Sequence, residues 1–136
     1  MRTEEANLLL AEFVGVEKTD LKDSFNEVIY RLPDEIREFM HCSHFGHLRF
    51  HESWDWLMVV VEKIETICPK DNVSEQFRVK ISGRSCDILD MFRDGSDYQK
   101  DFLKIYFNMH ESKRSTVWHA CVKFVQWYNL NKETYE

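Results

Sequence analysis

The sequence contains few residues that interrupt or cross-link a chain. Its 136 residues include four glycines, two prolines and four cysteines, and they form no glycine-, serine- or proline-rich linker and no internal repeat. A chain of this length has the size of one ordinary domain and can bury a hydrophobic core without disulfides. We therefore expect residues 1–136 to form a single domain.

The sequence also lacks a long hydrophobic run, and its first residues do not predict a leader segment. The longest apolar run extends only from Trp56 to Val61, whereas a membrane-spanning helix needs roughly 20 residues. Glu4 and Glu5 stand where a signal peptide carries basic residues. These features predict a cytoplasmic protein that does not enter a membrane and whose thiols stay reduced. Three cysteines with apolar neighbours are then small core residues: Cys68, Cys86 and Cys121.

Positive charge is in deficit. The chain has 18 Lys and Arg against 24 Asp and Glu, which leaves a formal net charge of -6. Because such a charge repels phosphate, a strongly basic nucleic-acid-binding protein is not expected. Hydrophobic residues make up 43% of the chain and aromatic residues 14%, which excludes a disordered or low-complexity chain.

Catalytic motifs are absent as well. The sequence has no glycine-rich phosphate loop, no Ser-His-Asp pattern and no HExxH pair. His119 and Cys121 are two residues apart on a predicted helix, so they cannot face each other as a base and a nucleophile. Asp87 and Asp90 fall on opposite faces of a predicted strand, and we interpret the acidic cluster to which they belong as a solvated turn, not as a metal or acid/base site. We therefore predict a protein that is not an enzyme and that needs no cofactor.

The first 52 residues predict helices. Residues 4–14 have helical spacing, and Gly15 is a plausible stop. Residues 21–32 place apolar side chains on one helical stripe, and Pro33 ends it. Residues 33–40 begin with a proline and two acids, which suits the first turn of a short third helix.

Residues 53–130 predict a helix, three strands and a second helix. Ser53 is a good N-cap and Asp55 suits the positive end of the helix dipole. Residues 77–81, 86–92 and 103–107 are strand segments separated by turns at 82–85 and 94–97. Ser112 caps the last helix, whose broad apolar stripe is typical of a helix lying across a sheet.

These elements predict an α+β layered domain with the order αβββα. Both helices would pack on a three-stranded antiparallel sheet, the helices of residues 1–52 would cover its other face, and residues 131–136 would form a polar tail. Homodimerisation through an open sheet face is an alternative use of that face.

Three parts of the sequence form a recognisable signature: residues 53–58 with 60–65, residues 9–13, and residues 112–129 with their ending VKFVQWYN. In these parts the chain resembles small proteins of bacteriophages and Bacteroidota genomes. These parts cover about a third of the chain. Their arrangement is similar to that of the phage sandwich domain, in which helices flank a small sheet. Val59 stands where those proteins would have proline, and residues 17–46 look like an insertion. The resemblance implies the fold and a phage or prophage origin, with action inside a bacterial host cell, and it implies no catalytic residues.

The leading functional hypothesis is therefore a non-catalytic module that binds another protein. Trp54 and Trp56 are candidate anchors, since tryptophan often dominates binding energy at interfaces. An acidic domain can occupy a basic surface such as the nucleic-acid groove of a defence nuclease, so inhibition of a CRISPR nuclease is a specific expectation. The candidate acidic contacts are Asp87, Asp90, Asp94 and Asp97. Alternatively, the tryptophans fill the layer between helices and sheet, with Trp54 as the exception.

Two other hypotheses remain open. The αβββα order also matches the double-stranded RNA-binding domain, for which the final helix offers Lys113, Arg114 and Lys123. A metal-binding protein is suggested by imidazoles and a thiol within residues 41–51, because these groups suit zinc or copper. Its candidate ligands are Cys42, His44, His47 and His51. No spacing here matches a known zinc finger, and a polar, pH-sensitive loop is the simpler interpretation.

Overall fold

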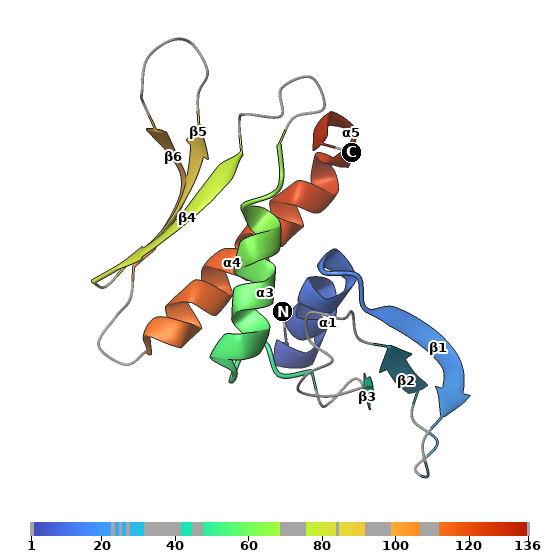
Figure 1. Cartoon of the computed structure of the whole chain (residues 1–136). Coiled ribbons are helices and arrows are strands. Elements are labelled where there is room, and N and C mark those ends of the chain that lie inside the picture. Colours follow the sequence, from blue (N-terminus) through green and yellow to red (C-terminus); the bar gives the residue numbers. More distant parts are fainter. Residues whose placement is uncertain are drawn as a thin grey trace. The chain divides into compact units, whose positions relative to one another are not determined.

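The computed structural model describes residues 2–22, 24, 26, 28–31, 42–44, 48–68, 76–83, 85–91, 99–106 and 112–135. They divide into two compact units, Met1–Val60 and Val61–Glu136, and we describe each unit by itself. The division falls within one helix, α3 (Trp54–Ile64). The class is α+β (Figure 1), as the sequence predicts.

Unit 1 begins with α1 (Thr3–Phe13), which corresponds to the helix predicted at residues 4–14. The helix ends as expected at Gly15, whose φ of +93° is one that glycine adopts readily. The amide of Val16 donates to the carbonyl of Ala11 over 2.9 Å, and the amide of Gly15 donates to Glu12 over 3.3 Å. These two bonds form a Schellman motif, which satisfies carbonyls at the end of the helix.

A three-stranded antiparallel sheet follows in unit 1. Its strands are β1 (Glu17–Lys22), β2 (Val28–Arg31) and β3 (Cys42–His44), in the order β1-β2-β3. In register, Lys18 lies opposite Tyr30 and Tyr30 lies opposite Ser43. The hydroxyl of Thr19 also donates to the carbonyl of Ile29, which ties β1 to β2.

The helix predicted at residues 21–32 is therefore wrong. The helical spacing of its apolar residues was outweighed by the run Val28, Ile29 and Tyr30, because β-branched and aromatic residues favour strands. Asn26 has a φ of 64°, a left-handed conformation that a right-handed helix does not contain. The helix predicted at residues 33–40 lies outside the described residues.

Unit 2 holds a second antiparallel sheet with the order β4-β5-β6. Its strands are β4 (Phe77–Ser82), β5 (Ser85–Met91) and β6 (Gln99–Tyr106). The first two coincide closely with the strand segments expected at 77–81 and 86–92, whereas β6 begins four residues before the expected 103. The expectation of one sheet was incomplete, because the described residues form two separate sheets, one in each unit.

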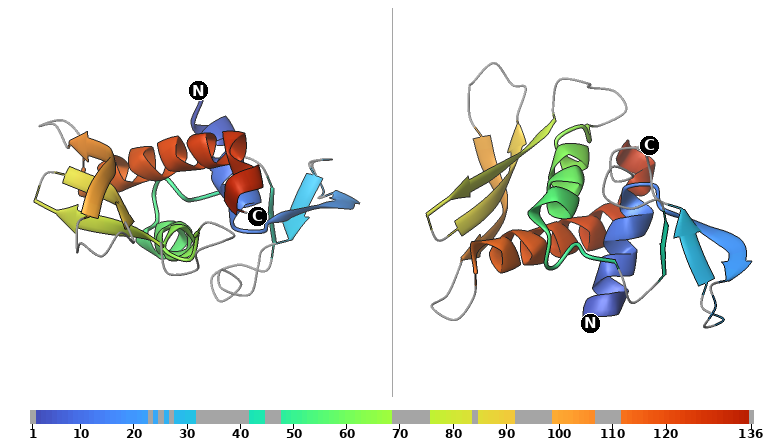
Figure 2. Two further views of the ribbon diagram at one scale, coloured as in Figure 1. Left: turned by 90° about the horizontal axis from the view of Figure 1, so that it is seen from above. Right: turned by 60° about the horizontal axis from the view of Figure 1, so that its bottom comes forward.

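Helix α4 (Lys113–Leu130) packs against β5 and β6 in unit 2, and both views of Figure 2 show it beside that sheet. The amide of Ser115 donates to the hydroxyl of Ser112 over 3.0 Å, so the predicted N-cap is present. Phe77 of β4 contacts Phe124 and Trp127 of α4 edge-on, with ring centroids 5.0 Å and 5.8 Å apart. A short helix, α5 (Lys132–Tyr135), occupies most of the expected polar tail.

Candidate interaction surface

Helix α3 has one buried face and one exposed face. Ser53 starts the helix as predicted: its hydroxyl accepts from the amide of Trp56 over 3.4 Å, and its carbonyl accepts from Leu57 over 3.0 Å. Asp55 lies in the first turn, where a carboxylate complements the helix dipole. The buried side chains form a single helical stripe: Trp56, Leu57, Val60, Val61 and Ile64.

The opposite side of the same helix carries apolar groups beside acids. Trp54, Met58 and Glu62 follow one another at intervals of four residues, so they lie along one line on the helix surface. Asp55 and Val59 form the neighbouring line. Trp54 is 38% exposed, Met58 and Val59 are half-buried, and both acids are exposed. We call these five residues the α3 outer face.

The loop that leads into α3 is fixed to α1 within unit 1. Asn7 of α1 is 2% exposed, and its Nδ2 donates to the carbonyl oxygen of Leu48 over 3.0 Å. The same Nδ2 lies 2.7 Å from Nδ1 of His51. Phe50 packs edge-on against Trp56 with ring centroids 5.1 Å apart. This loop therefore determines where α3 begins and where Trp54 is displayed.

The two candidate tryptophans have different environments. Trp54 is exposed, as expected for the exception among the four tryptophans. Trp56 is 1% exposed and packs against Phe50, so its burial does not support a direct contact with a partner. The core role that the sequence leaves open for the tryptophans fits Trp56, and also Trp127, which contacts Phe77 and Phe124 in unit 2.

The candidate acids belong to unit 2, and Asp87 is the one among them whose side chain the structure describes. Asp87 is 7% exposed, because it lies in the central strand with Lys80 of β4 and Lys104 of β6 as its register partners. The interpretation of Asp87 as part of a solvated turn is therefore wrong. Asp90 lies further along β5, opposite Phe77 in register. The two remaining candidates, Asp94 and Asp97, lie outside the described residues.

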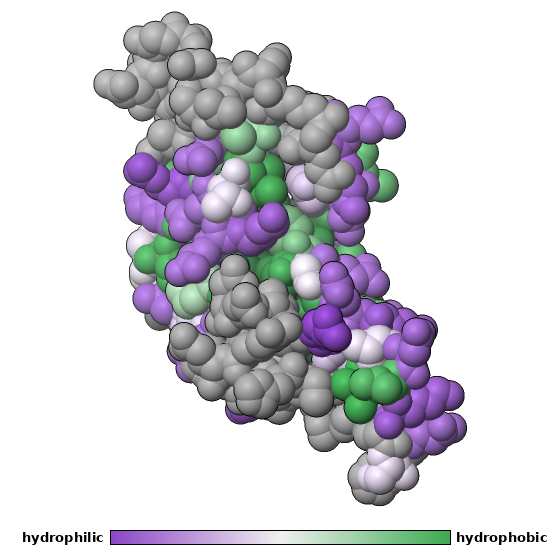
Figure 3. Space-filling view, turned by 45° about the vertical axis from the view of Figure 1, so that its right-hand side comes forward, coloured by the Kyte–Doolittle hydropathy of each residue, from purple (hydrophilic) through white to green (hydrophobic). Residues whose placement is uncertain are grey.

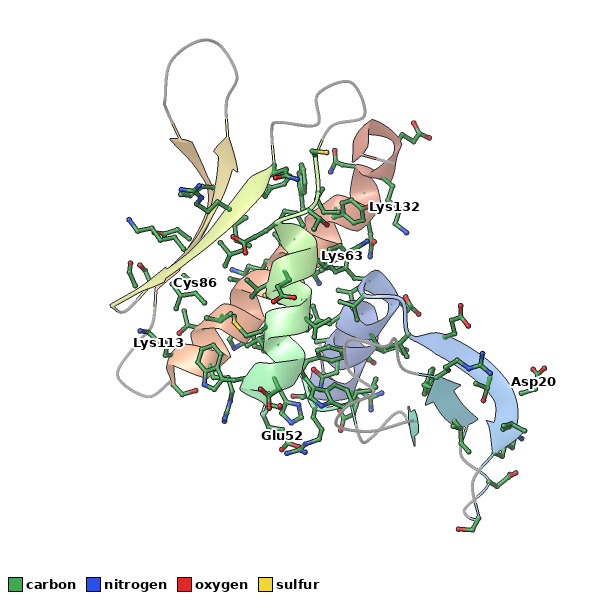
Figure 4. The ribbon with its side chains drawn as sticks, in the orientation of Figure 1. Asp20, Glu52, Lys63, Cys86, Lys113 and Lys132 are labelled. Atoms are coloured by element: carbon green, nitrogen blue, oxygen red, sulfur yellow. The ribbon has the colours of Figure 1, made fainter. Side chains whose placement is uncertain are left out.

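The net negative charge of the chain belongs to unit 1, because the charges of unit 2 balance. Residues 1–60 contain twelve Asp and Glu and six Lys and Arg, whereas residues 61–136 contain twelve of each. The whole formal charge of -6 therefore belongs to unit 1. Hydrophilic residues cover most of the coloured surface in Figure 3, and hydrophobic residues show between them. Asp20 of β1 extends away from its strand in Figure 4, and Glu52 lies at the start of α3.

The basic residues of α4 do not share one face. Lys113 starts the helix (Figure 4), and both Lys113 and Lys123 are exposed. Arg114 is half-buried on the side of the helix that faces the core, and its Nε is buried without a hydrogen-bond partner in the described part of the chain. Residues at these spacings point in different directions around a helix. Helix α4 therefore does not present an aligned row of bases to a phosphate backbone.

The four candidate metal ligands are not assembled into a site that the structure describes. Cys42 and His44 lie in β3, whose backbone alone is described, and His47 lies outside the described residues. His51 contacts Asn7 and lies 3.9 Å from a carboxylate oxygen of Glu52. Among the described residues, no group of three or more His, Cys, Asp or Glu side chains is arranged to hold a metal ion.

The two buried thiols of unit 2 are poor nucleophiles. Burial, with a contribution from the negative charge of Asp87, raises the pKa of Cys86 to about 12. Burial raises the pKa of Cys121 well above 9.0, and the nearby Cys86 adds to this effect. Because the thiolate is the reactive species, both cysteines stay protonated and unreactive near neutral pH.

Asn7, Met58 and Val59 were not identified from the sequence. A polar residue between Ala6 and Leu10 on the buried side of α1 is the one signal that marks Asn7.

In the described residues, no helix is long and apolar enough to cross a membrane. Scans against protein-family models, curated proteins and solved structures returned no match to this chain.

Proposed function

We propose that the chain is a protein-binding module that uses the α3 outer face as its contact surface. The observation that carries this proposal is the exposure of Trp54 at the start of a well-packed helix, next to Met58 and Val59. Large aromatic side chains of this kind supply much of the binding energy at protein interfaces when a partner pocket desolvates them. The rest of the helix is anchored by its buried stripe, so little ordering is needed on binding.

The charge of unit 1 defines the kind of partner. Asp55 of unit 1 and Glu62, which follows on the same helix in unit 2, flank the apolar groups of the α3 outer face, and unit 1 as a whole has twice as many acidic as basic residues. A complementary partner has an apolar pocket surrounded by Lys and Arg. Such charge complementarity accelerates association and makes binding sensitive to salt.

A nucleic-acid groove is a basic surface of this type. We propose that the partner is a bacterial defence nuclease, such as a CRISPR nuclease, and that the chain is a phage or prophage protein that blocks its groove. This specific identity derives from the sequence resemblance and from the charge of unit 1. In this proposal the protein acts in the bacterial cytoplasm by binding alone, without catalysis and without a cofactor.

The contact surface is tested by capturing partners from bacterial lysate with matched variants. Trp54→Ala should lower the affinity for the captured protein about 30-fold, the effect of losing a residue worth about 2 kcal/mol. The control is Leu130→Ala, which removes a side chain that is 87% exposed at the end of α4. Equal capture by both variants would show that the α3 outer face is not the contact surface.

The charge component is tested with a second pair of variants. Glu62→Lys reverses an exposed charge on the α3 outer face, and Glu133→Lys makes the same change on α5. We expect Glu62→Lys to weaken binding more than Glu133→Lys at low salt, with the difference shrinking as salt is added.

The identity of the partner is tested in cells with an active CRISPR system that express the wild type, Trp54→Ala or Leu130→Ala. The wild type and Leu130→Ala should reduce CRISPR interference, and Trp54→Ala should not.

A further inference from the structure

At the entrance to α3, a backbone carbonyl and a histidine ring share the same buried donor, the side-chain amide of Asn7. Asn7 Nδ2 donates to the carbonyl oxygen of Leu48 and also lies 2.7 Å from His51 Nδ1. An amide nitrogen can only donate, so Nδ1 of His51 must accept. The neutral ring then carries its proton on Nε2, the nitrogen that lies 3.9 Å from Glu52 Oε2.

A protonated His51 does not fit this arrangement. The added proton would sit on Nδ1 and face the NH2 group of Asn7, so two donors would oppose each other. Rotating the amide by half a turn would let its oxygen accept from the charged ring. The Leu48 carbonyl, which is 41 residues away in sequence, would then lose its donor. Either way, protonation of His51 removes one of these two hydrogen bonds between Asn7 and the loop.

Two charged groups lie near the ring. Glu52 Oε2 is 3.9 Å from His51 Nε2, and Glu52 is also paired with Arg49, whose Nε lies 3.0 Å from Glu52 Oε1. Asn7, which α1 contributes, is uncharged, and in its present orientation it offers the ring a donor, which suits the neutral ring. The ring is partly exposed, with 39% of its side chain accessible, so protons can reach it from solvent.

We propose that His51 is a proton-sensitive switch for the α3 outer face. The neutral ring allows Asn7 to bond to the loop of residues 48–53 at two points, and the charged ring weakens this attachment to α1. The amides of Glu52 and Ser53 both donate to the carbonyl of Arg49, over 3.1 Å and 3.0 Å. Ser53 in turn caps α3, so a weaker attachment of this loop loosens the helix start that carries Trp54. Only the last step, weaker partner binding in acid, rests on the proposed function.

The switch itself is tested without a partner. NMR should find the His51 ring protonated on Nε2 at pH 7.5. Hydrogen exchange of amides 48–57, corrected for intrinsic rates, should be about fivefold faster at pH 5.5, the effect of losing one hydrogen bond. His51→Gln, which cannot gain a charge, should abolish this acceleration. His119→Gln is the control, because His119 lies on α4 against Trp118, and it should keep the response of the wild type.

Two results would overturn the switch: a ring protonated on Nδ1 at pH 7.5, or the same acceleration in His51→Gln as in the wild type. The last step is tested separately, by comparing affinity for the captured partner at the two pH values. The wild type should bind more weakly at pH 5.5, and His51→Gln should not. If exchange responds to acid while affinity does not, then the loop does not control Trp54. If Trp54→Ala leaves binding intact, the proposed function fails whatever the exchange data show.

Discussion

The buried thiol of Cys86 predicts a loss of stability in alkali. Cys86 lies in the central strand β5, opposite Ile81 and Ile105 in register, and is completely buried. Its pKa rises from 9.0 to about 12, chiefly through burial and secondly through the charge of Asp87. The thiol therefore ionises more readily in the unfolded chain than in the folded one. Its contribution to stability is complete below pH 9.0 and is lost progressively as the pH rises toward about 12.

The size of the effect follows from these two values. Between pH 8 and pH 10, linkage predicts that ionisation of Cys86 in the unfolded state lowers the free energy of unfolding by about 1.4 kcal/mol. Lysines, tyrosines and Cys121 also titrate in alkali. The contribution of Cys86 must therefore be measured as the difference in pH-dependent stability between the wild type and a variant that lacks this thiol. Urea unfolding at both pH values should show that Cys86→Ala loses about 1.4 kcal/mol less than the wild type over this range.

Cys68 provides the matched control, because it is a half-buried cysteine of the same unit. Cys68→Ala should keep most of the pH dependence of the wild type. If the wild type and Cys86→Ala lose the same stability between pH 8 and pH 10, the thiol is not shielded as the structure indicates. Rapid alkylation of Cys86 in the folded protein at pH 8 would lead to the same conclusion.

Three further substitutions test the local structure by urea unfolding. Trp56→Ala removes a buried ring and its contact with Phe50, and should cost about 3–5 kcal/mol; a cost below about 1 kcal/mol would contradict its burial. Gly15→Ala places a side chain at a φ of +93° and should cost about 1–2 kcal/mol through backbone strain alone, because nothing lies within 4 Å of the added carbon. Ser112→Ala removes the N-cap of α4 and should cost about 1 kcal/mol, whereas Ser115→Ala, which keeps the cap acceptor and the amide that donates to it, should have a smaller effect.

Local signals predicted the elements whose ends are set by a single residue. Gly15 ends α1, Ser53 begins α3 and Ser112 begins α4, each through a bond to its own helix. The alternation of residues 77–81 similarly predicted β4. The β1–β2 hairpin was missed because its residues 21–32 also fit a helical stripe. Pairing with β3 favours the strand, and β3 lies more than ten residues further along the chain, where local periodicity carries no information.

The candidate site shows the same limit. The buried stripe of α3 correctly indicated that Trp54 faces outward. For Trp56 the sequence left two roles open, and its burial against Phe50 depends on a contact that helical spacing does not reveal. Asn7 meets Leu48 and His51 across 41 and 44 residues, so no local pattern could have identified that cluster.

Two of the four edge strands, β1 and β4, give a reason to expect binding through a helix face and not through strand addition. An exposed edge strand offers unpaired amides on which a partner strand can pair. On β4 the amide of Phe77 donates to the carbonyl of Ile67 over 3.3 Å, and the amide of Val79 donates to the carboxylate of Glu65 over 3.3 Å. These donors are therefore already used within unit 2. The edge strand β1 of unit 1 carries alternating acids and bases along an exposed length, which also opposes pairing with another strand. The α3 outer face has neither obstacle, because Trp54 is exposed, Met58 and Val59 are partly accessible, and the backbone is already hydrogen-bonded within the helix.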